Sequence, residues 1–98
     1  MTAKTKPFDA ADYLETEEDA AAYMTEALAS GEAAVVARAL GTIARARGMS
    51  RIARKTGLAR ESLYRALSAE GNPELTTVLR IIEAIGLRLS AEPASKAA

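Results

Sequence analysis

The 98-residue sequence contains no cysteine, no histidine and no tryptophan, and it has few aromatic residues of any kind. The absence of cysteine excludes disulfides, thiolate nucleophiles and cysteine-ligated zinc, and it fits a reducing cytoplasm. The absence of histidine removes the commonest general base and metal ligand at neutral pH. No apolar run approaches the ~20 residues of a membrane span, and the first residues lack the hydrophobic core of a signal peptide. We therefore expect a cytoplasmic protein with no cofactor, no metal and no membrane partner.

The length suits one small domain with a modest core, and the abundance of alanine favours closely packed helices. The residues that are present show no nucleophile beside a base, no phosphate-binding glycine loop and no metal-ligand spacing. The acidic residues cluster at the expected start of a helix, where capping and the helix dipole already explain them. We therefore expect a binding protein and not an enzyme.

The net charge of zero conceals two oppositely charged segments. Residues 1–35 contain eight acidic residues and two lysines, a net charge of −6. Residues 45–65 contain seven basic residues and one glutamate, a net charge of +6. A charged run is usually a solvated face, but two opposite runs in so short a chain suggest two surfaces for two kinds of partner.

Hydrophobic periodicity predicts five helices, over residues 17–29, 32–47, 50–56, 60–68 and 75–85. Thr16 followed by Asp19 predicts a capped start for the first helix, and Ser50 is expected to cap the third. The alternation in residues 87–90 predicts a short strand, which needs a partner edge near Phe8 or in a second subunit. The apolar residues expected to face the core are Ala20, Met24, Ala27, Leu28, Val36, Leu40, Ile43, Ala44, Leu75, Val78, Leu79, Ile82 and Ile85.

The most informative stretch is residues 49–68, which read MSRIARKTGLARESLYRALS. Two helices that cross steeply over a short turn need a residue at positive φ, which Gly57 adopts without steric cost. Ile52, Leu58, Leu63 and Leu67 can then be buried together. The pattern predicts a DNA-binding helix-turn-helix, and the alternative is a helical hairpin that binds nothing. Because phosphate contacts supply much of the affinity for DNA, the coincident basic run favours DNA binding.

From Phe8 to Ser90 the chain resembles the addiction-module antidote proteins, small antitoxins of the lambda-repressor/Cro-like helix-turn-helix class encoded beside a RelE-like toxin. The segments that carry the resemblance are IARARGMS, TGLARESLYRALS and GNPELTTVLRIIEAIGL. The resemblance implies an all-α, five-helix domain with a short C-terminal strand. It also implies a homodimer that binds double-stranded operator DNA, represses its own operon and neutralises the toxin. The alternative is a stand-alone helix-turn-helix repressor without a toxin partner.

The helix-turn-helix pattern predicts two groups of DNA-contacting residues. The third helix could instead expose Arg54 and Lys55 only to solvent. In the fourth helix, Tyr64 could pack sideways on the third helix, and Glu61 could orient Arg65 by an i,i+4 pair. The predicted phosphate contacts are Ser50, Arg51, Arg54 and Lys55, and the predicted base-facing residues are Arg60, Glu61, Tyr64 and Arg65.

We divide the chain into an N-terminal extension (residues 1–15), a helix-turn-helix domain (residues 16–90) and a tail expected to be disordered (residues 91–98). Acidic side chains speed encounter with a basic toxin, and apolar side chains between them supply buried anchors. The alternative is that the apolar residues pack on the first and fifth helices and the acids only cap the first. The predicted partner-binding residues are Phe8, Asp9, Asp12, Tyr13 and Leu14.

Overall fold

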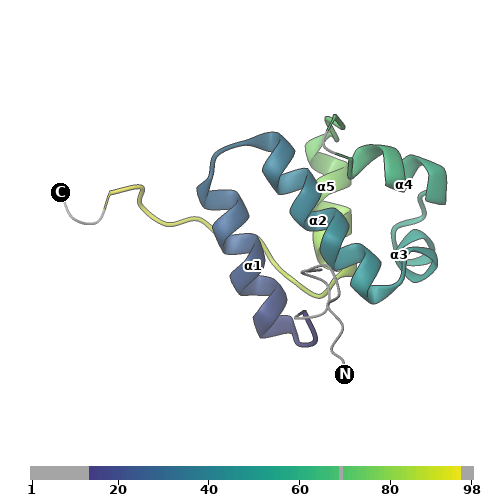
Figure 1. The fold of residues 1–98 in the computed structure, drawn as a ribbon, viewed down its shortest axis with the longest axis horizontal. Helices are drawn as coiled ribbons and strands as arrows, with labels where there is room; N and C mark the ends of the chain where they lie inside the picture. Colours follow the sequence, from purple (N-terminus) through teal and green to yellow (C-terminus); the bar gives the residue numbers. More distant parts are fainter. Residues whose placement is uncertain (1–13, 69, 96–98) are drawn as a thin grey trace, which may run out of the picture.

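The computed structural model describes residues 14–68 and 70–95. This part of the chain consists of five helices joined by short connections, so the predicted all-helical architecture is confirmed for it. The helices are α1 (Glu17–Ala29), α2 (Ala33–Arg47), α3 (Met49–Thr56), α4 (Arg60–Ala66) and α5 (Leu75–Ala84). Helices α1 and α2 form an antiparallel hairpin, α3 and α4 lie at the opposite end of the molecule from α1, and α5 lies behind α2 (Figure 1).

The start of α1 confirms the capping prediction. Thr16 Oγ1 accepts a hydrogen bond of 3.0 Å from the backbone N–H of Asp19, and three acidic residues occupy the first turn. The prediction that Ser50 caps the third helix is wrong. Gly48, at φ 101°, is the only residue between α2 and α3, so α3 begins at Met49 without a side-chain cap.

Helix α2 is the centre of the core. It packs against α1, α3 and α5. Because these neighbours lie on several sides of α2, the buried part of its surface is wider than one apolar stripe. Leu40 and Ile43 are fully buried, as predicted. Its buried residues are Ala37, Ala39, Leu40, Gly41, Thr42, Ile43 and Ala44.

The predicted apolar faces of α1 and α5 are only partly correct. Leu28 is 42% exposed at the end of α1, and on α5 Leu75 is 68% and Leu79 is 46% exposed. Ile81, which the periodicity did not single out, is fully buried. The apolar residues of α5 lie around more than half of the helix circumference. Helices α2 and α3 cover only the side that contains Ile81, Ile82 and Ile85.

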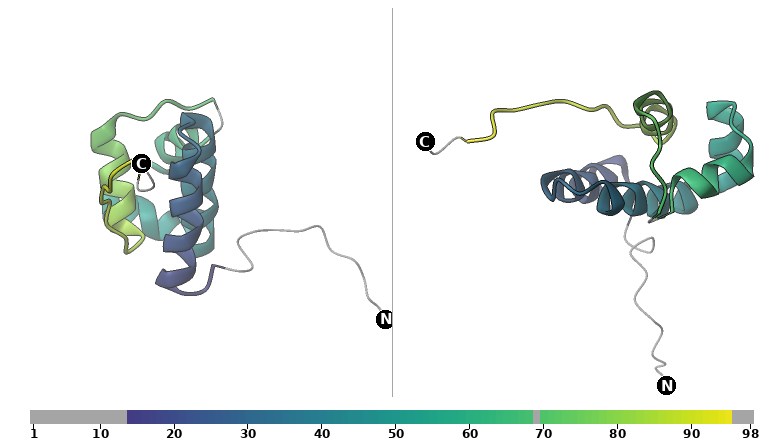
Figure 2. Two further views of the ribbon diagram at one scale, coloured as in Figure 1. Left: turned by 90° about the vertical axis from the view of Figure 1, so that its left-hand side faces the viewer. Right: turned by 90° about the horizontal axis from the view of Figure 1, so that it is seen from above.

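The predicted strand over residues 87–90 is not seen in the described part of the chain. Leu87 donates its backbone N–H to the carbonyl of Ile82 at 3.0 Å, which ends α5. The chain then continues in an extended form and passes α1 (Figures 1 and 2). A strand requires a second hydrogen-bonded edge, and no described segment offers one to these residues.

Candidate nucleic-acid interface

The turn between α3 and α4 is closed by a glycine and a threonine. Gly57 has φ 78° and ψ 10°, and its N–H donates to the carbonyl of Ala53 at 2.9 Å. A Cβ at this position would meet nothing within 4 Å, so the backbone conformation and not lack of space requires glycine. The buried Thr56 hydroxyl donates to Ile52 O at 2.8 Å and accepts from Leu58 N at 3.2 Å. Sequence reasoning missed this role of Thr56, although a hydroxyl residue beside a turn glycine is a known turn signal.

The inner side of this helical pair is packed as predicted except at Leu58, which is only half-buried. Ile52 and Leu63 are fully buried and Leu67 is 6% exposed. Gly41 of α2, which the sequence analysis did not notice, lets the end of α4 approach α2, because a Cβ there would lie 3.1 Å from the carbonyl oxygen of Leu67. The backbone just after α4 therefore passes close to α2.

The predicted DNA-contacting residues lie on two helices that pack against each other, and Lys55 also lines a hollow with Arg80 and Glu83 of α5. All eight are exposed, and in both helices they follow the same i, i+1, i+4, i+5 spacing, which places four side chains on one side of each helix. Five are basic and one is acidic, a net charge of +4. Those on α3 are Ser50, Arg51, Arg54 and Lys55, and those on α4 are Arg60, Glu61, Tyr64 and Arg65. We call these eight residues the basic hairpin face.

Two residues of the basic hairpin face are paired with each other. Arg60 Nη2 donates a hydrogen bond of 3.1 Å to the hydroxyl oxygen of Tyr64, and its guanidinium carbon lies 5.5 Å from the centre of the tyrosine ring. Tyr64 remains 47% exposed. The cation–π contact and the hydrogen bond together restrict the conformations of the Arg60 side chain in the unbound protein. Glu61 lies in the first turn of α4, where its charge complements the helix dipole.

The start of the described chain lies against the end of α2. Leu14 is 5% exposed within the core, and its carbonyl accepts a 2.8 Å hydrogen bond from Arg47 Nη1. The side chain of Leu14 therefore has a structural role within this chain, which is the alternative that the sequence analysis left open for it. The other predicted partner-binding residues, Phe8, Asp9, Asp12 and Tyr13, lie outside the described residues.

A run of acidic residues surrounds α1. Residues 14–37 contain six acidic side chains and no basic one, and all six are exposed. They belong to α1 and its two flanking connections, and α1 lies on the other side of α2 from α4 (Figure 1). They are Glu15, Glu17, Glu18, Asp19, Glu26 and Glu32. The acidic helix α1 and the helix α4 of the basic hairpin face are thus separated in space.

In residues 14–68 and 70–95, no group of three or more acidic side chains is arranged to hold a metal ion. None of the five helices is both long and apolar enough to cross a membrane.

Comparison with known proteins gives one family. A family model described as "probable addiction module antidote protein" matches residues 4–93. An uncharacterized protein of Haemophilus influenzae is 44% identical over 92 residues, which cover 94% of this chain and 95% of that protein. No solved structure matches. Since the family match includes all five helices and the basic hairpin face, the chain belongs to the probable addiction module antidote proteins.

Proposed function

We propose that this chain is an antitoxin that binds double-stranded operator DNA as a homodimer, represses its own operon and neutralises a RelE-like toxin. The antidote family implies a toxin partner of some kind, which favours this function over a stand-alone repressor. The observation that carries the DNA-binding part is the basic hairpin face, where eight exposed side chains on two packed helices have a net charge of +4. The protein acts by binding and not by catalysis.

In this proposal α4 enters the major groove. An α-helix with its side chains is about 10–12 Å in diameter, which fits a major groove about 12 Å wide. Arg65 and Arg60 can each make two hydrogen bonds to guanine, and Glu61 can accept one from cytosine N4. Helix α3 lies across the phosphate backbone, where Arg51 and Arg54 neutralise phosphates.

The contact between Arg60 and Tyr64 supports base reading by α4. A free arginine side chain loses about 1.5–2 kcal/mol of rotamer entropy when it is fixed, and an arginine already held by a tyrosine loses less on binding. Tyr64 also keeps an exposed ring edge, which can contact a thymine methyl group or a phosphate. The pair is therefore preorganised for a site that contains guanine.

The DNA site follows from the homodimer. Two copies related by a two-fold axis recognise an inverted repeat. Their two α4 helices reach successive major grooves when the half-sites lie roughly one helical turn, about 34 Å, apart.

We expect Arg65→Ala to weaken binding to the operator by about 1–3 kcal/mol and to weaken binding to a scrambled duplex much less, because a base contact carries sequence information. Fluorescence anisotropy with both duplexes at several salt concentrations measures this difference. The matched control is Arg38→Ala, an exposed arginine on α2 outside the basic hairpin face. Equal losses on the two duplexes would assign Arg65 to a phosphate. Failure of the wild-type protein to bind its own promoter at low salt would contradict the DNA-binding proposal.

The toxin part of the proposal rests on the family and on charge. A RelE-like toxin acts on RNA, so its functional face should be positive. The N-terminal extension and α1 together present acidic side chains that complement such a face. Phe8 and Tyr13 would supply the buried anchors, because Leu14 is already buried in the core.

We expect a chain shortened to begin at Leu14 to bind the toxin at least ~30-fold more weakly, which corresponds to about 2 kcal/mol for the lost anchors. Leu14 is kept because it packs in the core and its carbonyl binds Arg47. Calorimetry measures the affinity, and circular dichroism and DNA binding show whether the fold is intact. The control chain lacks only residues 1–7. Unchanged toxin affinity would move the toxin-binding surface to α1, α2 or α5.

A further inference from the structure

The segment that follows α5 is extended and runs past α1 (Figures 1 and 2). Among the described residues, residues 88–95 make no backbone hydrogen bond. Leu87 and Leu89 are half-buried against the core, whereas Arg88, Ser90 and Glu92 are exposed. One face of this extended segment is therefore held by the core, and no described residue pairs with its backbone groups. Such an edge is a template for strand pairing.

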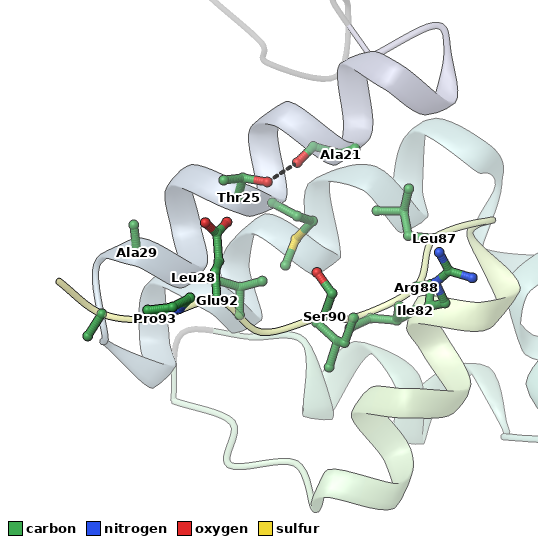
Figure 3. Close-up of a pocket in the computed structure, with 13 residues that line it drawn as sticks. Ala21, Thr25, Leu28, Ala29, Ile82, Leu87, Arg88, Ser90, Glu92 and Pro93 are labelled. Atoms are coloured by element: carbon green, nitrogen blue, oxygen red, sulfur yellow. Dashed lines mark hydrogen bonds between the residues drawn. The ribbon is translucent and has the colours of Figure 1, made fainter. Parts of the chain in front are cut away.

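A groove runs between this segment and α1. Its volume is about 590 Å³, and α1 contributes one wall that includes Met24, Thr25 and Leu28. Figure 3 shows Arg88, Ser90 and Glu92 in sequence along the opposite wall. Leu28 is 42% exposed here, so a large apolar side chain borders an open groove beside an unpaired backbone. A chain lying in the groove could bind both.

The charges of the segment are complementary to those of a second copy of itself. If two copies run antiparallel with Ser90 opposite Ser90, then Arg88 of each lies opposite Glu92 of the other. Within one chain these two charges are four residues apart, about 13 Å in extended backbone, which is too far for an ion pair. A shift of one residue would separate both ion pairs, so the charge pattern selects one register.

The same register continues the apolar face. Residues directly opposite each other in an antiparallel pair point to the same side, so Leu89 would lie beside Ala91 of the second copy. Two-fold pairing would place the second segment in the groove, where it would cover Leu28. The segment lies away from α3 and α4 (Figures 1 and 2), so this pairing leaves the basic hairpin face of each copy accessible.

We infer that two copies of this chain associate by antiparallel pairing of residues 87–93 about a two-fold axis at Ser90, with Arg88 and Glu92 forming reciprocal ion pairs. The inference rests on the homodimer of the proposed function, and it adds the interface of that dimer and the register in which the two segments pair.

The first test is a single engineered thiol in a chain that has no cysteine. Directly opposite residues in an antiparallel pair have Cα atoms about 4.5–5.5 Å apart, within the range of about 4.4–6.8 Å that a disulfide spans. We expect the full-length Ser90→Cys variant to form a disulfide-linked dimer under mild oxidation. The control, Thr76→Cys, lies exposed on α5 and should stay mainly monomeric on a denaturing gel.

The second test reverses charges. Arg88→Glu or Glu92→Arg alone places like charges opposite each other twice, and each should raise the dimer dissociation constant about 10-fold in sedimentation equilibrium. The double variant Arg88→Glu, Glu92→Arg should return to within about threefold of the wild type, whereas Arg80→Glu on α5 should have no effect.

The outcomes separate the interface from the dimer. A wild-type dimer whose Ser90→Cys variant does not cross-link, and whose dissociation constant is unchanged by the single reversals, would overturn this interface and leave the homodimer standing. A wild-type chain that is monomeric at every concentration would overturn both.

Discussion

Replacing Arg51, Arg54 and Lys55 together by alanine should make DNA binding much less sensitive to salt. The slope of the logarithm of the binding constant against the logarithm of the salt concentration should become about three units less steep per bound subunit, because each phosphate contact contributes about 0.9. All three side chains are exposed on α3. For each bound subunit, a difference of this size makes the wild-type affinity fall about 40-fold more than that of the variant between 50 and 200 mM salt. The loss should be similar for operator and scrambled DNA, because phosphates carry no base information.

Anisotropy titrations at four or five salt concentrations measure these slopes. Arg54→Ala alone should remove about one unit, and Arg38→Ala on α2 should remove none. Circular dichroism should show unchanged helix content in the triple variant, because the three side chains lie outside the core. An unaltered slope would mean that the charges of α3 are only solvated surface, as the alternative in the sequence analysis holds.

Ile52→Ala is expected to lower the free energy of unfolding by about 2–5 kcal/mol. Ile52 is fully buried and lies on α3, where that helix packs against α2, α4 and α5. Deleting its outer carbons leaves a cavity that fixed helices on several sides cannot fill. Domains of this size are stable by about 5–15 kcal/mol, so the variant loses a large share of its stability. DNA binding should weaken with it at 37 °C, because α3 holds α4 in place.

Urea denaturation followed by circular dichroism tests this expectation. Ile52→Val keeps most of the volume and should cost only about 0.5–1.5 kcal/mol. Ala53, the half-buried neighbour, offers a further comparison, since Ala53→Gly removes little packing and mainly lowers helix propensity, by about 1 kcal/mol. A loss below about 1 kcal/mol for Ile52→Ala would contradict the close packing of α3 on its neighbours.

Much of the local structure could be predicted because it depends on neighbours in the sequence. Thr16 and Asp19 are three residues apart, so their capping bond needs only one helical turn. The five helices and the glycine turn at Gly57 follow from periodicity and from backbone sterics. Errors of local prediction arose where two elements meet, as at Ser50, whose expected capping position is taken by Gly48 because α2 and α3 share one connecting residue.

Other features depend on which helices become neighbours. The role of Gly41 appears only when the end of α4 packs on α2, and Arg47 gains its function only when Leu14 returns to the end of α2, 33 residues away in sequence. The spacing of a glycine or an arginine within a helix does not predict a contact with a distant part of the chain.

The number of helices, the turn that joins α3 to α4 and the separation of acidic from basic residues along the chain could all be predicted from the amino-acid sequence, because they depend on composition and short-range geometry. Which apolar side chains are buried depends on tertiary packing. Leu28, Leu75 and Leu79 match the helical period as well as Ile82 does, yet they stay exposed because no described element covers them. Periodicity predicts that a helix has an apolar face. How much of that face is buried depends on the helices that pack against it.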